Sequence, residues 1–235
     1  GPEVLGSYVL VTYYIAVLFR LSVLGFDKGV LRHLPMTRAG EPSETVKKES
    51  SVLGTAIRFT LGISLLFTLA VFLFPRFFLF FRVSNSEPGL DLSWWLVVLM
   101  IALPAQVLIR VVLFAIRGLS VMWVYVVVQN LVAPLSLVGL SVLPMFFGAD
   151  EKSLAFGFIA SAYVTLAVAL VFFKRFFSRQ TFLTLLFAKH ERSLTKFSPP
   201  QGLTETLNYL LSRIDVIMVA AFFPHRPELV AFYGI

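Results

Sequence analysis

Uninterrupted apolar runs are the feature that most constrains the fold of this chain. SLLFTLAVFLF at 64–74 and YVTLAVALVFF at 163–173 contain no charged residue, and the mean hydropathy of the chain is +0.86. A soluble core cannot hide this much apolar surface. The hydrocarbon core of a bilayer is about 30 Å thick, and a helix of about 20 apolar residues crosses it. The sequence therefore predicts an all-α integral membrane protein.

Six stretches are long and apolar enough to cross a bilayer, and charged breaks separate them. We place these spans at residues 4–24, 51–74, 92–114, 120–146, 153–173 and 203–223. A cleaved signal peptide is not predicted, because no basic segment and no small-residue cleavage site accompany the first span. The expected architecture is a bundle of about six transmembrane helices.

Lysine and arginine concentrate in alternate breaks, which indicates the orientation of the spans. The breaks at 28–50 and 174–196 are rich in basic residues, whereas those at 75–91 and 147–152 hold few. By the positive-inside rule the basic breaks face the cytoplasm, as expected for a multi-pass protein of the cell (plasma) membrane. The net charge of +7 is thus explained by topology, and no nucleic-acid partner is predicted.

Side-chain patterns that carry catalysis are missing from the sequence. Cys is absent, the three His residues are scattered, and HExxH, DxD and Ser–His pairings do not occur. Glu87 and Asp91 lie in an outer break that resembles a solvated turn. An integral membrane enzyme, such as a glycan polymerase or prenyl-phosphate transferase, is therefore the less favoured alternative. We predict no catalytic residue, metal ligand or cofactor.

The chain ends with a version of its own beginning. RPELVAFYGI at 226–235 aligns with GPEVLGSYVL at 1–10, with proline, glutamate and tyrosine in register. Two unrelated helix starts can share Pro-Glu, since both residues suit a helix N-terminus. The length of the match favours an internal repeat of about 225 residues. Because the chain is out of phase with this repeat, we expect a fragment that lacks its first helix and most of a second half.

The segment 177–201 differs from the spans. TFLTLLFAKHERSLTKF places Phe182, Leu185 and Leu186 at helical spacing and then becomes basic. This pattern predicts an amphipathic helix on the inner leaflet, with membrane lipid as its partner. SPPQG at 198–202 is predicted to break that helix before the last span. The expected domains are an N-terminal lobe at 1–176, a cytoplasmic amphipathic linker at 177–201 and the first helix of a C-terminal lobe at 202–235.

Five short motifs follow one another along the chain: GPEVLGSYVLV, LGFDKGVLRHLP, AIRGL, LLSRIDVIMVAAFF and RPELVAFYGI. In this order they resemble the polysaccharide and lipid-linked oligosaccharide flippases of the multidrug/oligosaccharidyl-lipid/polysaccharide exporter superfamily. The resemblance implies helices two to seven of a twelve- to fourteen-helix transporter, whose two lobes face each other across a central cavity. The missing remainder of the chain would then supply helices one and eight and complete the cavity.

Charged residues inside the spans need a physical reason, because a charge at mid-bilayer costs about 2.5–3.5 kcal/mol. Arg20 and Arg110 lie near cytoplasmic span ends, where a long side chain can snorkel to the interface. Arg58 lies deeper in its span. Gly54 and Gly62 flank it and leave room for either a close neighbouring helix or a bulky head group.

The last span has a polar face. On a helical wheel Glu205 and Asn208 share an arc, with Arg213 at one edge and Asp215 at the other. Lipid does not tolerate such a face, so it must meet protein or water. Arg213 and Asp215 need separate partners, because residues two apart do not face each other on a helix. Interhelical hydrogen bonding and a wet cavity wall both explain the pattern.

Two other spans carry helix breakers and amides. Pro104 and Pro134 each free a backbone carbonyl and permit a kink. Gln129 and Asn130 either bond a neighbouring helix or line the cavity.

The resulting hypothesis is a flippase that exports a polyprenyl-diphosphate-linked saccharide by alternating access. Arginines would hold the diphosphate through charge-assisted hydrogen bonds. The substrate-binding candidates are Arg213, Arg58, Arg110 and Arg20, and the candidates for ion coupling or structural pairing are Asp215, Glu205 and Asn208. The alternative is an ion-coupled drug exporter of the same superfamily, which favours a more acidic cavity than the basic balance of these spans provides.

Overall fold

The computed structural model describes residues 2–37, 42–74, 92–146, 153–178, 181, 184–185, 188–214 and 218. All the regular secondary structure in these residues is helical. The helices are α1 (Pro2–Val23), α2 (Phe26–Thr37), α3 (Pro42–Leu73), α5 (Leu92–Met100), α6 (Leu103–Gly118), α7 (Met122–Val127), the π-helical segment η1 (Val128–Val132), α8 (Ala133–Phe146), α9 (Ser153–Phe176) and α11 (Arg192–Ser212).

Four helical segments are long and apolar enough to cross a membrane: Thr45–Leu73, Trp94–Gly118, Met122–Val142 and Leu154–Phe176. They correspond to the second to fifth predicted spans. The spans predicted at 4–24 and 203–223 extend into residues or side chains outside the described part of the chain, and these two stay predictions. The described residues are therefore all-helical in their regular structure and contain four candidate membrane spans, and the bundle of six remains an expectation.

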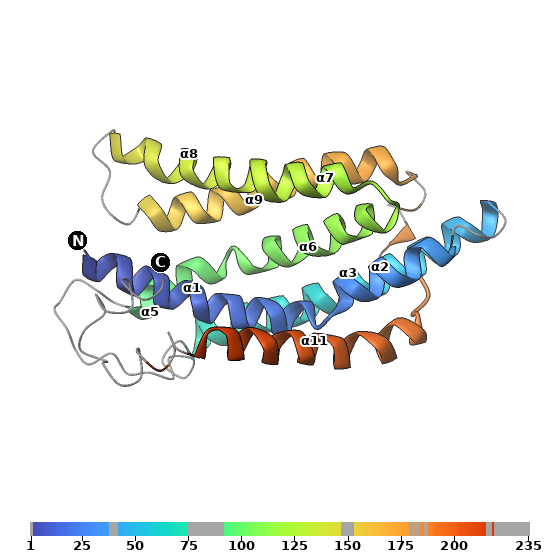
Figure 1. The fold of residues 1–235 in the computed structure, drawn as a ribbon, viewed down its shortest axis with the longest axis horizontal. Coiled ribbons are helices and arrows are strands. Elements are labelled where there is room, and N and C mark those ends of the chain that lie inside the picture. The colour runs from blue at the N-terminus through green and yellow to red at the C-terminus, as the bar shows by residue number, and fades with distance from the viewer. Residues whose placement is uncertain are drawn as a thin grey trace.

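The long helices run side by side, with α6 at the centre (Figure 1). In this view the α8–α9 pair covers one side of α6, and α1, α2 and α3 lie on the other side, followed by α11. Burial agrees with this order, because 61% of the apolar window of Trp94–Gly118 is buried, against 17% of Met122–Val142. The central helix therefore belongs to the protein core, whereas α7–η1–α8 presents much of its surface outward.

The third predicted span is broken, as its proline predicts. The α5 helix ends at Met100, and α6 begins at Leu103 with Pro104 in its first turn. Pro104 has no N–H for the Met100 carbonyl. The Thr68 hydroxyl, which donates to the Ser64 carbonyl at 2.8 Å, shares its hydrogen with the Met100 carbonyl at 3.4 Å. The Tyr163 hydroxyl donates to the next carbonyl, that of Ile101, at 3.2 Å. Side chains of α3 and α9 thus stabilise the kink.

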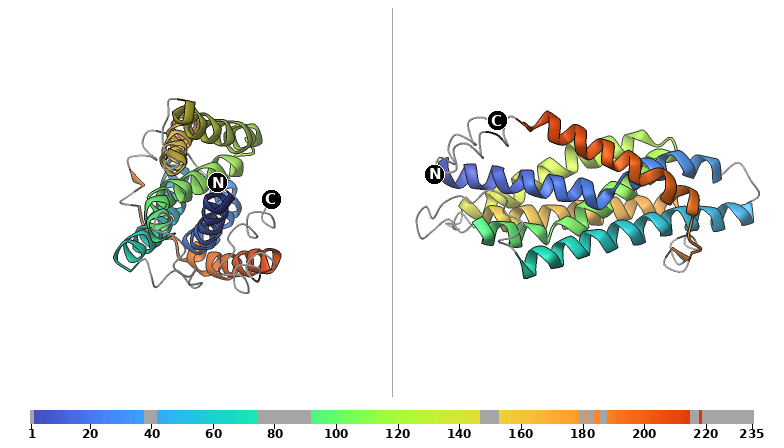
Figure 2. Two further views of the ribbon diagram at one scale, coloured as in Figure 1. Left: turned by 90° about the vertical axis from the view of Figure 1, so that its left-hand side faces the viewer. Right: turned by 90° about the horizontal axis from the view of Figure 1, so that it is seen from below.

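The break predicted at 198–202 is wrong. The α11 helix is continuous from Arg192 to Ser212, with Pro199 and Pro200 inside it. Packing outweighs the cost of the prolines, because α11 crosses the turn between α1 and α2 at backbone contact. A Cβ on Gly202 would lie 2.2 Å from the carbonyl carbon of Leu24. Figure 2 shows α1 and α11 side by side along this contact.

The predicted amphipathic helix is only partly within the described residues. Leu185 is buried, whereas Phe182 and Leu186 lie outside the described part of the chain. At the basic end of the pattern, residues 188–190 are not helical, whereas Arg192 and Lys196 lie in α11. The predicted domain boundaries stay predictions.

Candidate functional site

A buried ion pair joins α2 to the central helix. The Asp27 side chain is 1% exposed, and Arg110 Nε donates to its Oδ2 at 2.9 Å. The backbone N–H of Lys28 donates to Oδ1 at 2.8 Å. A buried carboxylate is tolerated only when it is paired and hydrogen-bonded. Arg110 therefore does not snorkel to the interface; it neutralises Asp27.

The turn between α1 and α2 brings Asp27 to this position. Leu24 and Gly25 have φ values of 44° and 72°, in the left-handed region that glycine adopts without strain. A Cβ on Gly25 would also lie 2.4 Å from the carbonyl oxygen of Ser198. Asp27 follows in the first turn of α2, where the helix dipole favours a negative charge.

Two arginine–tyrosine contacts connect α1 with α11. The guanidinium carbon of Arg20 lies 4.1 Å from the ring centroid of Tyr209, and that of Arg213 lies 5.5 Å from the ring of Tyr13. Both arginines also act electrostatically on the Tyr209 hydroxyl, so the four side chains form one group. Cation–π contacts of this kind hold a guanidinium without neutralising it.

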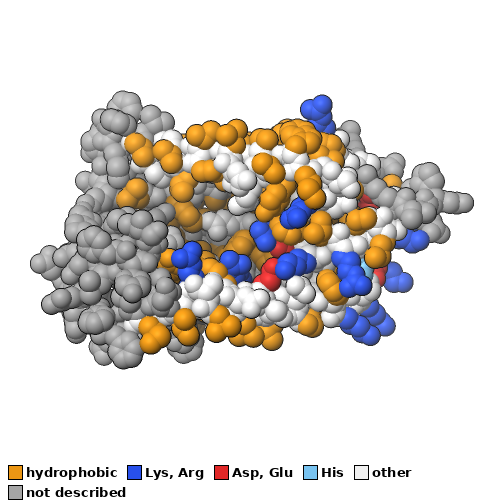
Figure 3. Space-filling view, viewed as in Figure 1, with side chains coloured by type: hydrophobic (Ala, Val, Ile, Leu, Met, Phe, Trp, Pro, Cys, Tyr) orange, Lys and Arg blue, Asp and Glu red, His pale blue; other side chains and the backbone are white. Residues whose placement is uncertain are grey.

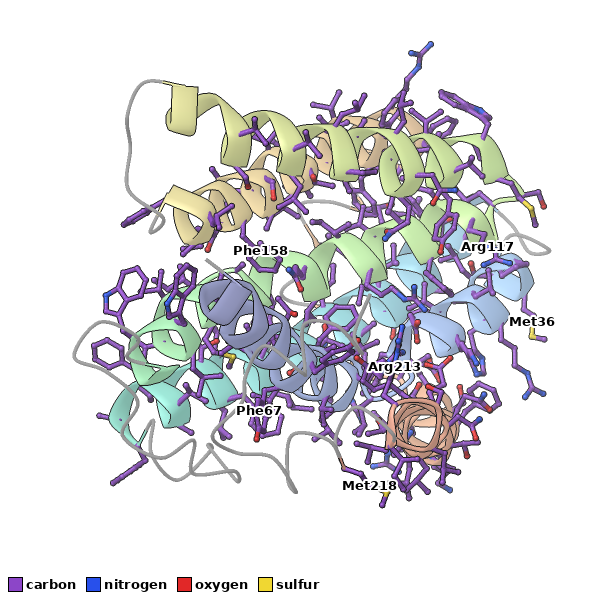
Figure 4. All side chains as sticks on the ribbon, turned by 60° about the vertical axis from the view of Figure 1, so that its left-hand side comes forward. Met36, Phe67, Arg117, Phe158, Arg213 and Met218 are labelled. Carbon is purple, nitrogen blue, oxygen red and sulfur yellow. The ribbon has the colours of Figure 1, made fainter. Side chains whose placement is uncertain are left out.

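Arg20 and Arg213 have no acidic partner among the residues that the structure describes. Arg20 Nε is buried and has no hydrogen-bond partner there. Arg213 directly follows the last residue of α11, so it lies at the helix end rather than inside a helix as the wheel assumed. In Figure 4 its side chain points toward α1 and α2.

The acidic and amide candidates of the last span have different positions. Glu205 pairs with Lys28, with Nζ and Oε1 2.5 Å apart, so it is a structural partner of α2. Asn208 is exposed, one turn before the end of α11. Asp215 lies outside the described residues. Figure 3 shows the Lys, Arg, Asp and Glu side chains gathered across the middle of one face, among hydrophobic side chains.

Arg58 makes its contacts elsewhere. Its Nε donates to the carbonyl of Gly54 at 3.0 Å, and a terminal nitrogen donates to the carbonyl of Ala188 in the linker at 2.6 Å. Gly54 leaves room for the linker backbone, because a Cβ there would lie 2.1 Å from the Leu185 carbonyl oxygen, while Gly62 faces open space. With 32 residues, about 48 Å, α3 is about 18 Å longer than a 30 Å hydrocarbon core. Arg58 therefore bonds the backbone of the segment predicted as the linker.

A second aromatic group links the central helix to α7. The guanidinium carbon of Arg110 lies 4.2 Å from the Phe114 centroid. That of Arg117 lies 5.5 Å from Phe114 and 5.4 Å from Tyr125 of α7. The basic side chains of α6 are thus shared between the buried carboxylate and the aromatic rings.

Sequence reasoning missed Asp27 and Lys28 as members of this site. Both lie within the motif LGFDKGVLRHLP, two and three residues after Gly25. The available signal was an acidic residue at a helix start, at a depth similar to that of Arg110. Within the described residues no group of three or more His, Asp or Glu side chains lies close enough to hold a metal ion.

Comparisons with protein-family models, with curated proteins and with solved structures find no match for this chain.

Proposed function

We propose that this chain is part of a membrane exporter that flips a lipid-linked oligosaccharide or polysaccharide precursor by alternating access. The observation that carries the proposal is that Arg20 and Arg213, between α1 and α11, form no ion pair within the described residues and lie beside four helices suited to a bilayer. A group that is anionic and attached to lipid satisfies both features. The diphosphate of a polyprenyl-linked saccharide has this chemistry.

Phosphate oxygens supply the negative charge and the hydrogen-bond acceptors that Arg20 and Arg213 lack within the described residues. Guanidinium groups bind them through charge-assisted, often paired hydrogen bonds. The buried Nε of Arg20 has no partner in the described part of the chain, and leaving such a donor unpaired costs about 1–3 kcal/mol. An anion that accepts from Arg20 and Arg213 would remove this cost. Arg110, held by Asp27, contributes less charge, and Arg58 positions the linker in this proposal.

Part of the contact between α11 and α1–α2 is compatible with movement. Beside the close backbone crossing at Gly202, it contains cation–π pairs and the partly exposed Lys28–Glu205 pair. Partly exposed ion pairs contribute roughly 0–1 kcal/mol each, so they separate and re-form at low cost. A rocking motion between two lobes requires contacts of this kind.

Export of the lipid-linked glycan in cells that express the full-length protein tests the proposal. We expect Arg20→Gln and Arg213→Gln to lower export by about tenfold or more, because each removes a charge-assisted bond of roughly 1.5–3 kcal/mol. Arg175→Gln, at an exposed cation at the end of α9, is the matched control. Normal export by both variants, at equal protein levels, would show that these arginines do not bind cargo. Resistance to cationic drugs without glycan export would favour the drug-exporter alternative.

A further inference from the structure

Two amide side chains lie exposed in the middle of a candidate span. Gln129 and Asn130 belong to the π-helical segment η1, inside Met122–Val142. Both are exposed, and neither has a hydrogen-bond partner within the described residues. Hydrocarbon offers no partner to an amide, so an amide in lipid loses its hydrogen bonds with water without replacement. This position therefore requires water, protein or a polar ligand.

The backbone adds an acceptor at the same position. The N–H of Ala133 donates to the carbonyl of Val128, five residues back. The next residue, Pro134, has no N–H to donate. The carbonyl of Gln129 would bond to one of these two residues in an α- or a π-helix, so it has no helical donor. An unpaired carbonyl and two amides thus share about one turn of helix.

This turn adjoins the cationic and aromatic group described above. Tyr125 lies four residues, about one turn, before Gln129. Its ring is 5.7 Å from that of Phe114 and lies under Arg117. Phe114 in turn contacts Arg110, the partner of Asp27. The unpaired polar groups of η1 therefore lie next to the cationic and aromatic group that joins α6 to α7.

We propose that Gln129, Asn130 and the free Gln129 carbonyl form a subsite for an uncharged, hydroxyl-rich group, the glycan of the exported lipid. This inference rests on the proposed function. Hydroxyl groups both donate and accept, as amides do, whereas an ionised phosphate only accepts. A phosphate here would leave the amide oxygens and the carbonyl unpaired. The anion consequently binds at the arginines, and the sugars bind at η1.

Thiol labelling tests whether this turn meets water. The chain has no Cys, so Gln129→Cys and Asn130→Cys each create a single thiol. Leu135→Cys is the matched control, since Leu135 is 63% exposed in the same segment and is expected to face lipid. A water-soluble maleimide reacts with the thiolate, which forms only in water. We expect labelling at 129 and 130 and little at 135. If none of the three positions is labelled, the subsite is refuted, and lipid or another helix covers Gln129 and Asn130.

Export of two cargos with the same lipid diphosphate tests the ligand. One cargo carries a single sugar and the other the complete glycan. We expect Gln129→Leu and Asn130→Leu to lower export of the complete glycan about tenfold and that of the single-sugar cargo less than about twofold. Equal losses, or none, would refute the glycan subsite while leaving the proposed function intact. If the unmodified protein exports neither cargo, the proposed function fails, and the glycan assignment fails with it.

Discussion

Removing the carboxylate of Asp27 should destabilise the protein by an amount that depends on Arg110. The Asp27 side chain is 1% exposed and accepts from Arg110 and from the backbone of Lys28. Breaking a buried ion pair by removing one partner costs roughly 3–5 kcal/mol. Arg110 is 27% exposed and regains some water. We therefore expect the lower end, about 3 kcal/mol, for Asp27→Ala.

The complementary change should cost at least as much. Arg110→Leu leaves the Asp27 carboxylate buried with one remaining donor among the described residues, the Lys28 N–H. In the double variant Asp27→Ala/Arg110→Leu no charge is left unpaired. Its cost should be well below the sum of the two single costs, with a coupling of about 2 kcal/mol or more.

Unfolding of the purified protein in detergent, followed through Trp fluorescence, measures these free energies. The three variants and the unmodified protein are compared under one condition, since only differences enter the cycle. Additive costs would refute the reasoning, because they would mean that Asp27 and Arg110 do not depend on each other. A cost below about 1 kcal/mol for Asp27→Ala would show that the carboxylate is solvated rather than buried.

Two further predictions concern the contact between α2 and α11. Gly202→Ala should lower the melting temperature by several degrees, because the new Cβ would lie 2.2 Å from the backbone of the α1–α2 turn. Gly62→Ala is the control and should not lower it, because Gly62 faces open space. Equal effects of the two substitutions would contradict the close crossing. Burial lowers the pKa of His33 below 6.5, with Arg32 acting in the same direction and Glu191 opposing it. Protonation therefore favours the state in which His33 is exposed. The contribution of neutral His33 to the free energy of unfolding is present in full above pH 6.5 and is lost as the pH falls through the lowered pKa. Hydrogen exchange of the α2 amides between pH 5 and 7 should show this loss of stability, and His33→Gln should abolish it. If the opening free energy of α2 depends on pH equally in the variant, another group causes the effect.

The sequence predicted what local composition determines. Each of the four candidate spans contains its own apolar run, and Pro104 marks the kink by itself, because it removes a backbone donor wherever it stands in a helix. The continuity of α11 through Pro199 and Pro200 was not predictable in this way. It depends on the close approach of Gly202 to a turn that lies far away in the chain.

The partners of the charged side chains could not be predicted from the sequence either. Arg110 and Asp27 are 83 residues apart, and Arg58 bonds a carbonyl 130 residues away. Depth along a helix indicates that a buried arginine needs a partner, but the identity of the partner depends on how the helices pack. For this reason the sequence grouped Arg58 with the cargo site and did not predict its bond to the carbonyl of Ala188.

The first turn of α2 holds two ion pairs that differ in their capacity to separate. Asp27 faces the central helix and pairs with Arg110, and the Asp27 side chain of this pair is almost fully buried. Lys28, the next residue, pairs with Glu205 of α11, and these side chains are 37% and 23% exposed. Separating the first pair strands a carboxylate away from water, whereas separating the second returns both charges to solvent. If α11 moves during export as proposed, α2 should therefore remain attached to α6, and the Lys28–Glu205 contact should be the one that opens.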